Sequence, residues 1–432
     1  MGIKINNEKY ETRAFDCWPK MKELRSKHFW HTWNAQKENN LVVLGMYATS
    51  PVLCGIGDFA SPSIGVHFTR LARTPNAEGL VQAIEAAEAW GLGRDVCGAM
   101  KEHLGQLLQG MSTTSPTGEK IKHDLALCTG CYAMIKSTQI GAEYLGVPTL
   151  FIDRPSAFDE NGRQYFLSQM QEAIEWLEKK TGREYDDEKL IEGVKNQIRS
   201  GAIMTKCFDL LRNIPTPASV RDMYSLRIPV TNDARHQETV DYANSLYDEL
   251  KYRVANKISS RGVEKVRLTY ENVFPFHRAD VLRSPEFYGA LFVYGRNCEA
   301  NSICSIWEYA EDGTRVPAKT LEERGIELRS REDALKAIID YQALRADNAD
   351  MPSHCYQRTM DYRCGAVVIQ YDRTCQLQMI HTPAAKLYLE EKGVPVGTYS
   401  CPQGDPREFD ERRVYRDLNT FYESLGLTRA AG

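Results

Sequence analysis

Short apolar runs rich in β-branched residues alternate along the chain with segments of helical periodicity. Runs of this kind are typical of parallel strands that are buried on both faces of a sheet. Alternating strands and helices predict an α/β fold with doubly wound parallel sheets. The predicted strands form a first set at 41–47, 124–128 and 149–153, and a second set at 265–271, 289–295, 365–372 and 395–401.

A long helical stretch separates the two sets of strands. Residues 164–257 are nearly all helical by period, and Pro215 and Pro217 interrupt them. A chain of 432 residues is long enough for two or three domains. We therefore predict two doubly wound, Rossmann-like α/β lobes, at 1–163 and 261–432, joined by a helical section at 164–260.

The composition excludes several classes of protein. Lys and Arg number 54 and Asp and Glu number 58, so no strong positive field draws the chain to nucleic acid or to an anionic membrane. No apolar run approaches the roughly 20 residues of a membrane span. The first residues lack the apolar core of a signal peptide. We expect a cytoplasmic protein with neither a nucleic-acid nor a membrane partner.

The twelve cysteines are the most informative feature of the composition. In a chain without a signal peptide the thiols should stay reduced, so each is either a small buried side chain or a metal ligand. The carboxyl ends of strands are where open α/β sheets bind ligands, and a helix N-terminus stabilises a thiolate. Scattered cysteines in such places predict an iron–sulfur cluster in a cleft between the lobes. Six cysteines lie at a strand end or a helix start: Cys54, Cys131, Cys298, Cys375 and Cys401 after predicted strands, and Cys97 at the start of a predicted helix.

Other motifs for cysteine or nucleotide chemistry are weak or absent. The segment CTGC, Cys128–Cys131, matches a redox pair, but a single CxxC is weakly specific. It has no second CxxC or HxxxH partner, which argues against a zinc ribbon or finger. The sequence has no GxxxxGK[ST] P-loop, so it should not hydrolyse ATP by that route.

Three segments that contain selected cysteines carry a further signal. They read GRDVCGAMKEHLG, LCTGCYAMIK and VVIQYDRTCQ. Together with FDCWPKMKELR and GDPREFDERR they resemble the benzoyl-CoA reductase/2-hydroxyacyl-CoA dehydratase family. The likeness covers nearly the whole chain and is greatest to the larger cluster-carrying subunit of ATP-dependent benzoyl-CoA reductases.

The resemblance implies a function and a set of partners. Carried over by position, the family's cluster ligands fall on Cys97, Cys131 and Cys375, which would hold a [4Fe–4S] cluster with one iron left open. A related smaller cluster-binding subunit would complete a heterodimer, and a separate ATP-hydrolysing iron–sulfur activator would supply low-potential electrons. An aryl-CoA substrate would be reduced at its thioester-activated ring to a cyclic dienoyl-CoA, anaerobically, in aromatic degradation.

Three alternatives stay open. A 2-hydroxyacyl-CoA dehydratase subunit would be a lyase that works through a ketyl radical and recovers its electron after each turnover. A reductase of small molecules with a double-cubane [8Fe–9S] cluster would need extra ligands, first Cys298 and then Cys304 or Cys128. A non-enzymatic relay subunit would leave the substrate to its partner.

For the proton donor that reduction requires, the candidate is His277, in a loop after a predicted strand.

Overall fold

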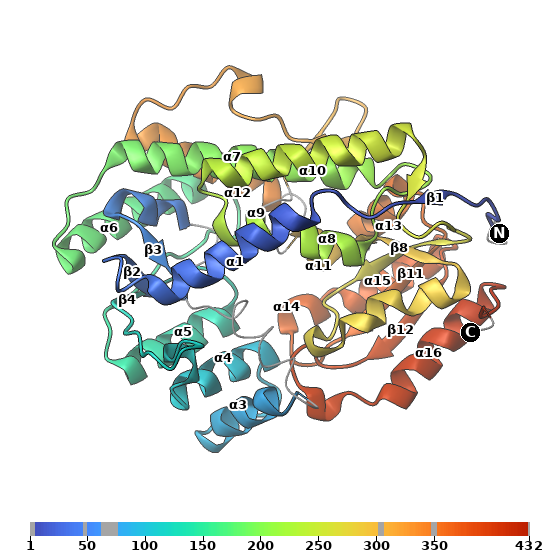
Figure 1. The fold of residues 1–432 in the computed structure, drawn as a ribbon, viewed down its shortest axis with the longest axis horizontal. Coiled ribbons are helices and arrows are strands. Elements are labelled where there is room, and N and C mark those ends of the chain that lie inside the picture. Colours follow the sequence, from blue (N-terminus) through green and yellow to red (C-terminus); the bar gives the residue numbers. More distant parts are fainter. Residues whose placement is uncertain (1–4, 46–49, 62–76, 301–305, 347–351, 431–432) are drawn as a thin grey trace.

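The computed structural model describes residues 5–45, 50–61, 77–300, 306–346 and 352–430. Within these ranges it contains two four-stranded parallel sheets, one in each lobe, and a group of long helices that runs along both (Figure 1). The predicted α/β class with Rossmann-like parallel sheets is therefore confirmed.

The N-terminal sheet has the strand order β3-β2-β4-β5, and every neighbouring pair is parallel. Its central strands are apolar runs without an exposed residue, as expected for a sheet covered on both faces. The short β3 was not predicted. The strands are β2 (Leu41–Leu44), β3 (Phe59–Ala60), β4 (Leu125–Cys128) and β5 (Thr149–Phe151), and the lobe's helices are α3 (Glu78–Ala89), α4 (Gly98–Leu108) and α5 (Tyr132–Leu145).

The C-terminal sheet has the order β12-β11-β7-β8 and is also parallel throughout. In both sheets the second strand along the chain lies on one side of the first, and the third and fourth lie on the other. The two lobes therefore share one topology. The strands are β7 (Arg267–Glu271), β8 (Leu291–Gly295), β11 (Ala366–Tyr371) and β12 (Val396–Ser400), each within two residues of its predicted bounds.

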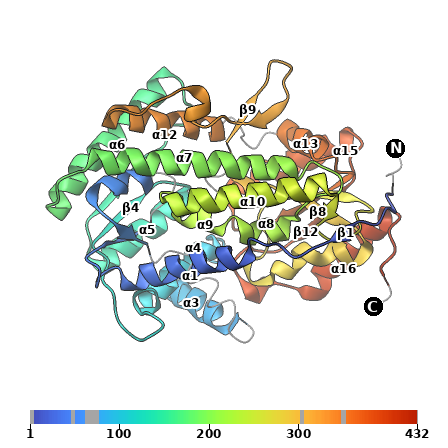
Figure 2. The ribbon, with the colours of Figure 1, turned by 45° about the horizontal axis from the view of Figure 1, so that its top comes forward.

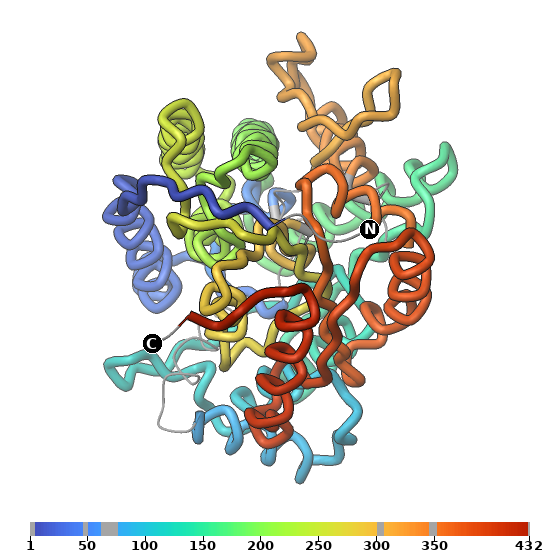
Figure 3. The backbone as a smooth tube through the Cα atoms, turned by 90° about the vertical axis from the view of Figure 1, so that its right-hand side faces the viewer, coloured from blue at the N-terminus to red at the C-terminus, as the bar shows by residue number. Residues whose placement is uncertain are grey.

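The helical section lies between the two sheets in the sequence and packs against both. Figure 2 shows α7 and α10 side by side along the molecule, and Figure 3 looks almost along their axes. The chain between α7 and α8 contains Pro215 and Pro217, which cannot continue a helix. The section contains α6 (Glu160–Thr181), α7 (Asp187–Leu210), α8 (Val220–Leu226), α9 (Ile228–Asp233) and α10 (Gln237–Ala255).

Helix α7 belongs to both hydrophobic cores. Its Leu190 and Val194 pack in the core of the N-terminal lobe, and its Met204 and Phe208 pack in the core of the C-terminal lobe. A helix of 24 residues is about 36 Å long, which is enough to reach from one sheet to the other. Because each end is buried in a different core, α7 fixes the two lobes relative to each other.

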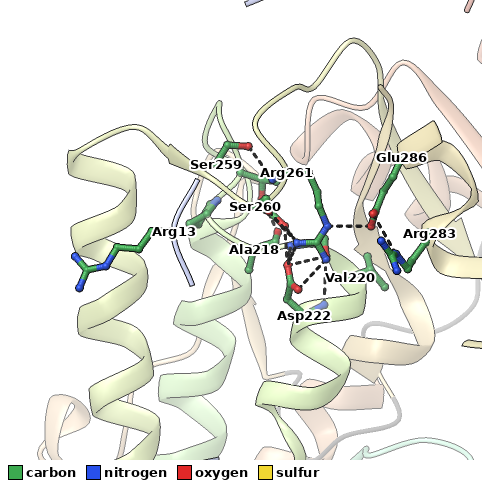
Figure 4. Close-up of polar contacts among 12 residues, drawn as sticks. Arg13, Ala218, Val220, Asp222, Ser259, Ser260, Arg261, Arg283 and Glu286 are labelled. Atoms are coloured by element: carbon green, nitrogen blue, oxygen red, sulfur yellow. Dashed lines mark hydrogen bonds and ion pairs between the residues drawn. The ribbon is translucent and has the colours of Figure 1, made fainter. Parts of the chain in front are cut away.

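A polar network ties the helical section to the C-terminal lobe (Figure 4). The guanidinium of Arg261 lies 3.0 Å from Asp222 in α8 and 3.0 Å from Glu286. Asp222 also closes a capping box with Ser219 at the start of α8. This network fixes α8 against the lobe beside β8.

None of the helices in the described ranges combines the length and the apolar character of a membrane span.

The remaining elements complete the two lobes. These elements are α1 (Trp18–Asn34), α11 (Arg296–Ala300), α12 (Arg331–Ala346), α13 (Pro352–Asp361), α14 (Gln376–Met379), α15 (Thr382–Glu391), α16 (Glu411–Ser424), the pair β1 (Glu11–Thr12) and β6 (Ile258–Ser259), and the pair β9 (Trp307–Tyr309) and β10 (Arg315–Pro317).

Candidate functional site

Three cysteines stand directly before helices on the facing sides of the two lobes. Cys97 precedes α4 and Cys131 precedes α5 in the N-terminal lobe, while Cys375 precedes α14 in the C-terminal lobe. Figure 1 shows α4 and α14 where the lobes face each other. Among the cysteines that the structure describes, these three are partly exposed and the others are buried. They are thus the thiols that a ligand can reach.

The three thiols lie close enough to influence one another's charge. A negative charge on Cys131 raises the pKa of Cys97, and charges on Cys97 and Cys131 raise the pKa of Cys375. The structure therefore brings together three side chains from stretches of the sequence that are far apart.

Burial is the main cause of the high pKa values at this site. It raises the pKa of Cys97 and raises that of Cys375 to about 12. The backbone N–H groups of Ala99 and Met100 oppose the rise in pKa at Cys97, and that of Gln378 opposes it at Cys375. The free thiols of Cys97 and Cys375 are consequently neutral at pH 7, and a bound metal would have to displace their protons.

A glutamine and an aspartate from the C-terminal lobe adjoin the cysteines. Gln403 donates a hydrogen bond from Nε2 to Sγ of Cys97, with 3.0 Å between the two atoms. Asp372 is fully buried beyond the end of β11 and accepts hydrogen bonds from Thr374 and from the backbone of Gln403. Neither residue was predicted from the sequence. Gln403 follows the strand β12 closely, so the strand-end rule that selected the cysteines applies to it as well.

Two glycines allow the lobes to touch at this site. A β-carbon on Gly404 would lie 2.7 Å from the backbone nitrogen of Ala99 and 2.7 Å from the carbonyl carbon of Gly98. Real β-carbons do not approach other atoms so closely. The loop that carries Gln403 therefore packs backbone to backbone against the first turn of α4.

An ion-pair cluster next to this contact joins the lobes electrostatically. Lys101 of α4 is fully buried, with Nζ 2.9 Å from Glu88 Oε1 and 3.7 Å from Asp405 Oδ2. Arg407 Nη2 lies 2.7 Å from both carboxylates. Arg407 and then Lys101 hold the pKa of Glu88 down to about 2. The ion pairs hold the first part of α4 against the loop that carries Gln403.

Three cysteine thiols are the ligand type that iron–sulfur clusters use. Within the described part of the chain, no three His, Cys, Asp or Glu side chains are close enough to hold one metal ion. A multi-iron cluster places its cysteine ligands further apart than one ion does, and it is bound by thiolates that accept N–H hydrogen bonds. Cys97, Cys131 and Cys375 could hold such a group.

The other candidate cysteines have different surroundings. Cys298, in α11, is fully buried in the core of the C-terminal lobe, with Sγ 3.8 Å from the carbonyl oxygen of Val220. Cys128 is buried at the end of β4 and accepts a hydrogen bond from Thr138. Cys304 lies outside the described residues. Cys54 and Cys401 are also buried.

His277 lies near the Gln403 loop but is held neutral. The backbone N–H of its neighbour Phe276 donates to the carbonyl oxygen of Gln403 at 2.8 Å. The His277 ring packs edge-on against Phe409, and neither ring nitrogen has a hydrogen-bond partner among the described residues. Burial lowers its pKa to about 4. At pH 7 the side chain is therefore an imidazole, which is a much weaker acid than imidazolium.

A small pocket with several charged side chains in its lining lies at the carboxyl ends of β7 and β11, where the strand order of the C-terminal sheet reverses. Its lining includes Glu271, Arg296, Arg358 and His381, none of which the sequence analysis selected. It also includes Gln378 of α14, the helix that follows Cys375. Crevices at such reversal points are the usual ligand sites of open α/β sheets.

Several known proteins are similar to this chain over most of its length. A family model described as 2-hydroxyglutaryl-CoA dehydratase, D-component, matches residues 75–425, a range that contains all three partly exposed cysteines. The (R)-phenyllactyl-CoA dehydratase alpha subunit of Clostridium sporogenes is 27% identical over 340 residues, 76% of each chain. The (R)-2-hydroxyisocaproyl-CoA dehydratase alpha subunit of Clostridioides difficile is 22% identical over 377 residues, 82% of this chain and 84% of the relative. A benzoyl-CoA reductase subunit of Thauera aromatica is 22% identical over 367 residues, 80% of each chain.

Proposed function

Because the chain belongs to the 2-hydroxyglutaryl-CoA dehydratase D-component family, we propose that it is the iron–sulfur subunit of an enzyme that acts on a CoA thioester by low-potential electron transfer. One observation carries the proposal: Cys97, Cys131 and Cys375 meet between the lobes and are the partly exposed cysteines of the described chain. A [4Fe–4S] cluster on these thiolates would supply single electrons at low potential.

The protein's own residues would prepare the site for this chemistry. The N-termini of α4 and α5 favour negative charge on Cys97 and Cys131. The ion pairs of Lys101 and Arg407 hold the lobes at a fixed separation, so the third thiol, from Cys375, stays near the other two. Partial exposure leaves room for a thioester to approach.

The first candidate reaction is ring reduction. The motifs that resemble benzoyl-CoA reductases favour an activator-driven aryl-CoA reductase, and a benzoyl-CoA reductase subunit is among the relatives. In that reaction the thioester-activated ring takes up electrons and protons and becomes a cyclic dienoyl-CoA. Electrons would then be consumed in proportion to product.

The second candidate is dehydration of a 2-hydroxyacyl-CoA. It is favoured by the identity of 27% to the (R)-phenyllactyl-CoA dehydratase alpha subunit, against 22% to the reductase subunit. A dehydratase recovers its electron after each turnover. The ratio of electrons consumed to product formed therefore separates the two reactions, in an assay with benzoyl-CoA and (R)-phenyllactyl-CoA as substrates.

Exposed apolar side chains beside the cysteines fit a protein partner. Tyr132 follows Cys131 and is 75% exposed, while Leu377 and Ile380 follow Cys375 and are 61% and 73% exposed. Large apolar side chains left exposed beside a site are a feature of protein interfaces. We propose that the related smaller cluster-binding subunit or the ATP-hydrolysing activator contacts the enzyme here.

The first experiment is to measure iron and acid-labile sulfide per chain, with an EPR spectrum, on anaerobically purified protein. About four irons per chain would support one [4Fe–4S] cluster on the three thiolates. About eight would instead favour the double-cubane [8Fe–9S] cluster, with Cys298 as the next ligand to test. A folded protein without iron would contradict the proposal.

A further inference from the structure

One side chain of the C-terminal lobe points its amide at a thiol of the N-terminal lobe. Gln403 Nε2 lies 3.0 Å from Cys97 Sγ, and Gln403 is 6% exposed. The two residues are 306 positions apart in the sequence. Because the amide of Gln403 is buried, its N–H group has a strong effect on the charge that the sulfur can carry.

The backbone of Gln403 is held on both sides. Its N–H donates to Asp372 Oδ2 at 3.0 Å, and its carbonyl oxygen accepts a hydrogen bond of 2.8 Å from the N–H of Phe276. Asp372 is in turn fixed by Thr374, which donates to Oδ1 from both its backbone N–H and its hydroxyl. The amide of Gln403 therefore reaches Cys97 from a rigid base and loses little freedom in doing so.

The contact exists only while the lobes are together. The backbone of Gly404 rests directly on Gly98 and Ala99, with no room for a β-carbon, and the next residue, Asp405, pairs with the buried Lys101. A small separation of the lobes would move the amide of Gln403 away from the sulfur of Cys97.

We propose that Gln403 is a positioning residue that raises the reduction potential of the cluster through its hydrogen bond to Cys97, and that this effect depends on lobe contact. The inference rests on the proposed function, because it concerns the cluster held by Cys97, Cys131 and Cys375. A reduced cluster carries more negative charge on its sulfur atoms than an oxidised one. A donor aimed at such a sulfur favours the reduced form.

The test is a redox titration of the cluster-loaded full-length chain under anaerobic conditions, followed by EPR. Gln403→Met keeps the size of the side chain and removes the N–H donor, so its midpoint potential should be more negative than that of the wild type. Gln376→Met is the matched control, because Gln376 adjoins Cys375 but its side chain is exposed to solvent. Its midpoint should equal that of the wild type, and iron per chain should be the same in all three proteins.

A second variant tests the dependence on lobe contact. Gly404→Ala keeps Gln403 but forces its loop away from α4, so the midpoint should shift in the same negative direction. If Gln403→Met cannot be loaded with iron, Gln403→Asn replaces it, since its amide is one methylene too short to reach the sulfur. If the midpoint potential of Gln403→Asn equals that of the wild type, the inference is overturned.

The outcomes separate this inference from the proposed function. A wild-type chain without a cluster would contradict both. A wild-type chain with a cluster, together with an unchanged midpoint in Gln403→Met, would overturn only the role of Gln403. An unchanged midpoint in Gly404→Ala would overturn the link to lobe contact.

Discussion

Lys101 Nζ lies 3.7 Å from Asp405 Oδ2, although the two residues belong to different lobes. Both side chains are almost completely shielded from water, and Glu88 and Arg407 complete the cluster. Buried charges of this kind are tolerated only when each has a partner. The junction between the lobes is therefore sensitive to the loss of any one member.

We expect Lys101→Met to destabilise the protein by about 3 kcal/mol, because it leaves the buried carboxylate of Asp405 and the partly buried carboxylate of Glu88 with one cation fewer. The free energy of unfolding in urea measures this effect. Lys20→Met is the matched control, since Lys20 forms an exposed pair with Glu23 and should change the stability by about 0.5 kcal/mol or less. Equal effects of the two substitutions would show that the buried cluster does not hold the lobes together.

Gly404→Ala should destabilise the junction by roughly 2 kcal/mol, because its β-carbon overpacks against the backbone of Gly98. Gly93→Ala adds the same methyl group where no atom lies within 4 Å, so it should leave the stability nearly unchanged. Thermal unfolding of the two variants against the wild type gives the comparison. Melting temperatures equal to that of the wild type in both variants would contradict this prediction.

Cys375→Ala should lower the iron content of the anaerobically purified protein to well below that of the wild type, because it removes the thiol that the C-terminal lobe contributes. Cys298→Ala should retain the wild-type iron content, since Cys298 is buried among core residues. Iron and sulfide analysis, with circular dichroism to verify folding, measures both. Loss of about half the iron in Cys298→Ala would instead support a larger cluster.

His123 should make the protein less stable in mild acid. Burial lowers its pKa to about 4 in the folded chain, from about 6.5 in the unfolded chain. Between these values the unfolded state binds more protons, so stability falls as the pH drops from about 6.5 towards 4. For one such group the loss between pH 7.5 and pH 5 is about 2 kcal/mol.

His123→Leu should remove this contribution, so the difference in unfolding free energy between pH 7.5 and pH 5 should be about 2 kcal/mol smaller than in the wild type. Urea denaturation at both pH values measures the difference. An unchanged pH dependence in His123→Leu would contradict the assignment of a buried, neutral imidazole.

The apolar runs in the sequence were enough to locate most strands of the two sheets. The strand predicted at 365–372 is observed as Ala366–Tyr371, and that at 395–401 as Val396–Ser400. Strands inside a parallel sheet are buried on both faces, so they are continuous apolar runs that any window along the sequence detects. The pair Phe59–Ala60 is too short to produce such a signal and was missed.

Strand ends and helix starts also predicted the kind of place where the site lies, but they did not identify its members. Cys54, Cys298 and Cys401 have the same strand-end signal as Cys131 and Cys375, yet the structure buries them and leaves only Cys97, Cys131 and Cys375 partly exposed among the described cysteines. Exposure depends on which elements pack over a residue, and spacing along the chain does not contain that information.

How the lobes meet follows from long-range packing and could not be predicted from local patterns. The hydrogen bond from Gln403 to Cys97 and the contact of Gly404 with Gly98 join residues some three hundred positions apart. Both contacts need the two lobes to lie side by side, and α7, which is buried in both cores, joins the lobes. Contacts of that range arise from the packing of whole elements, so periodicity and motifs predict the elements and leave the contacts between them open.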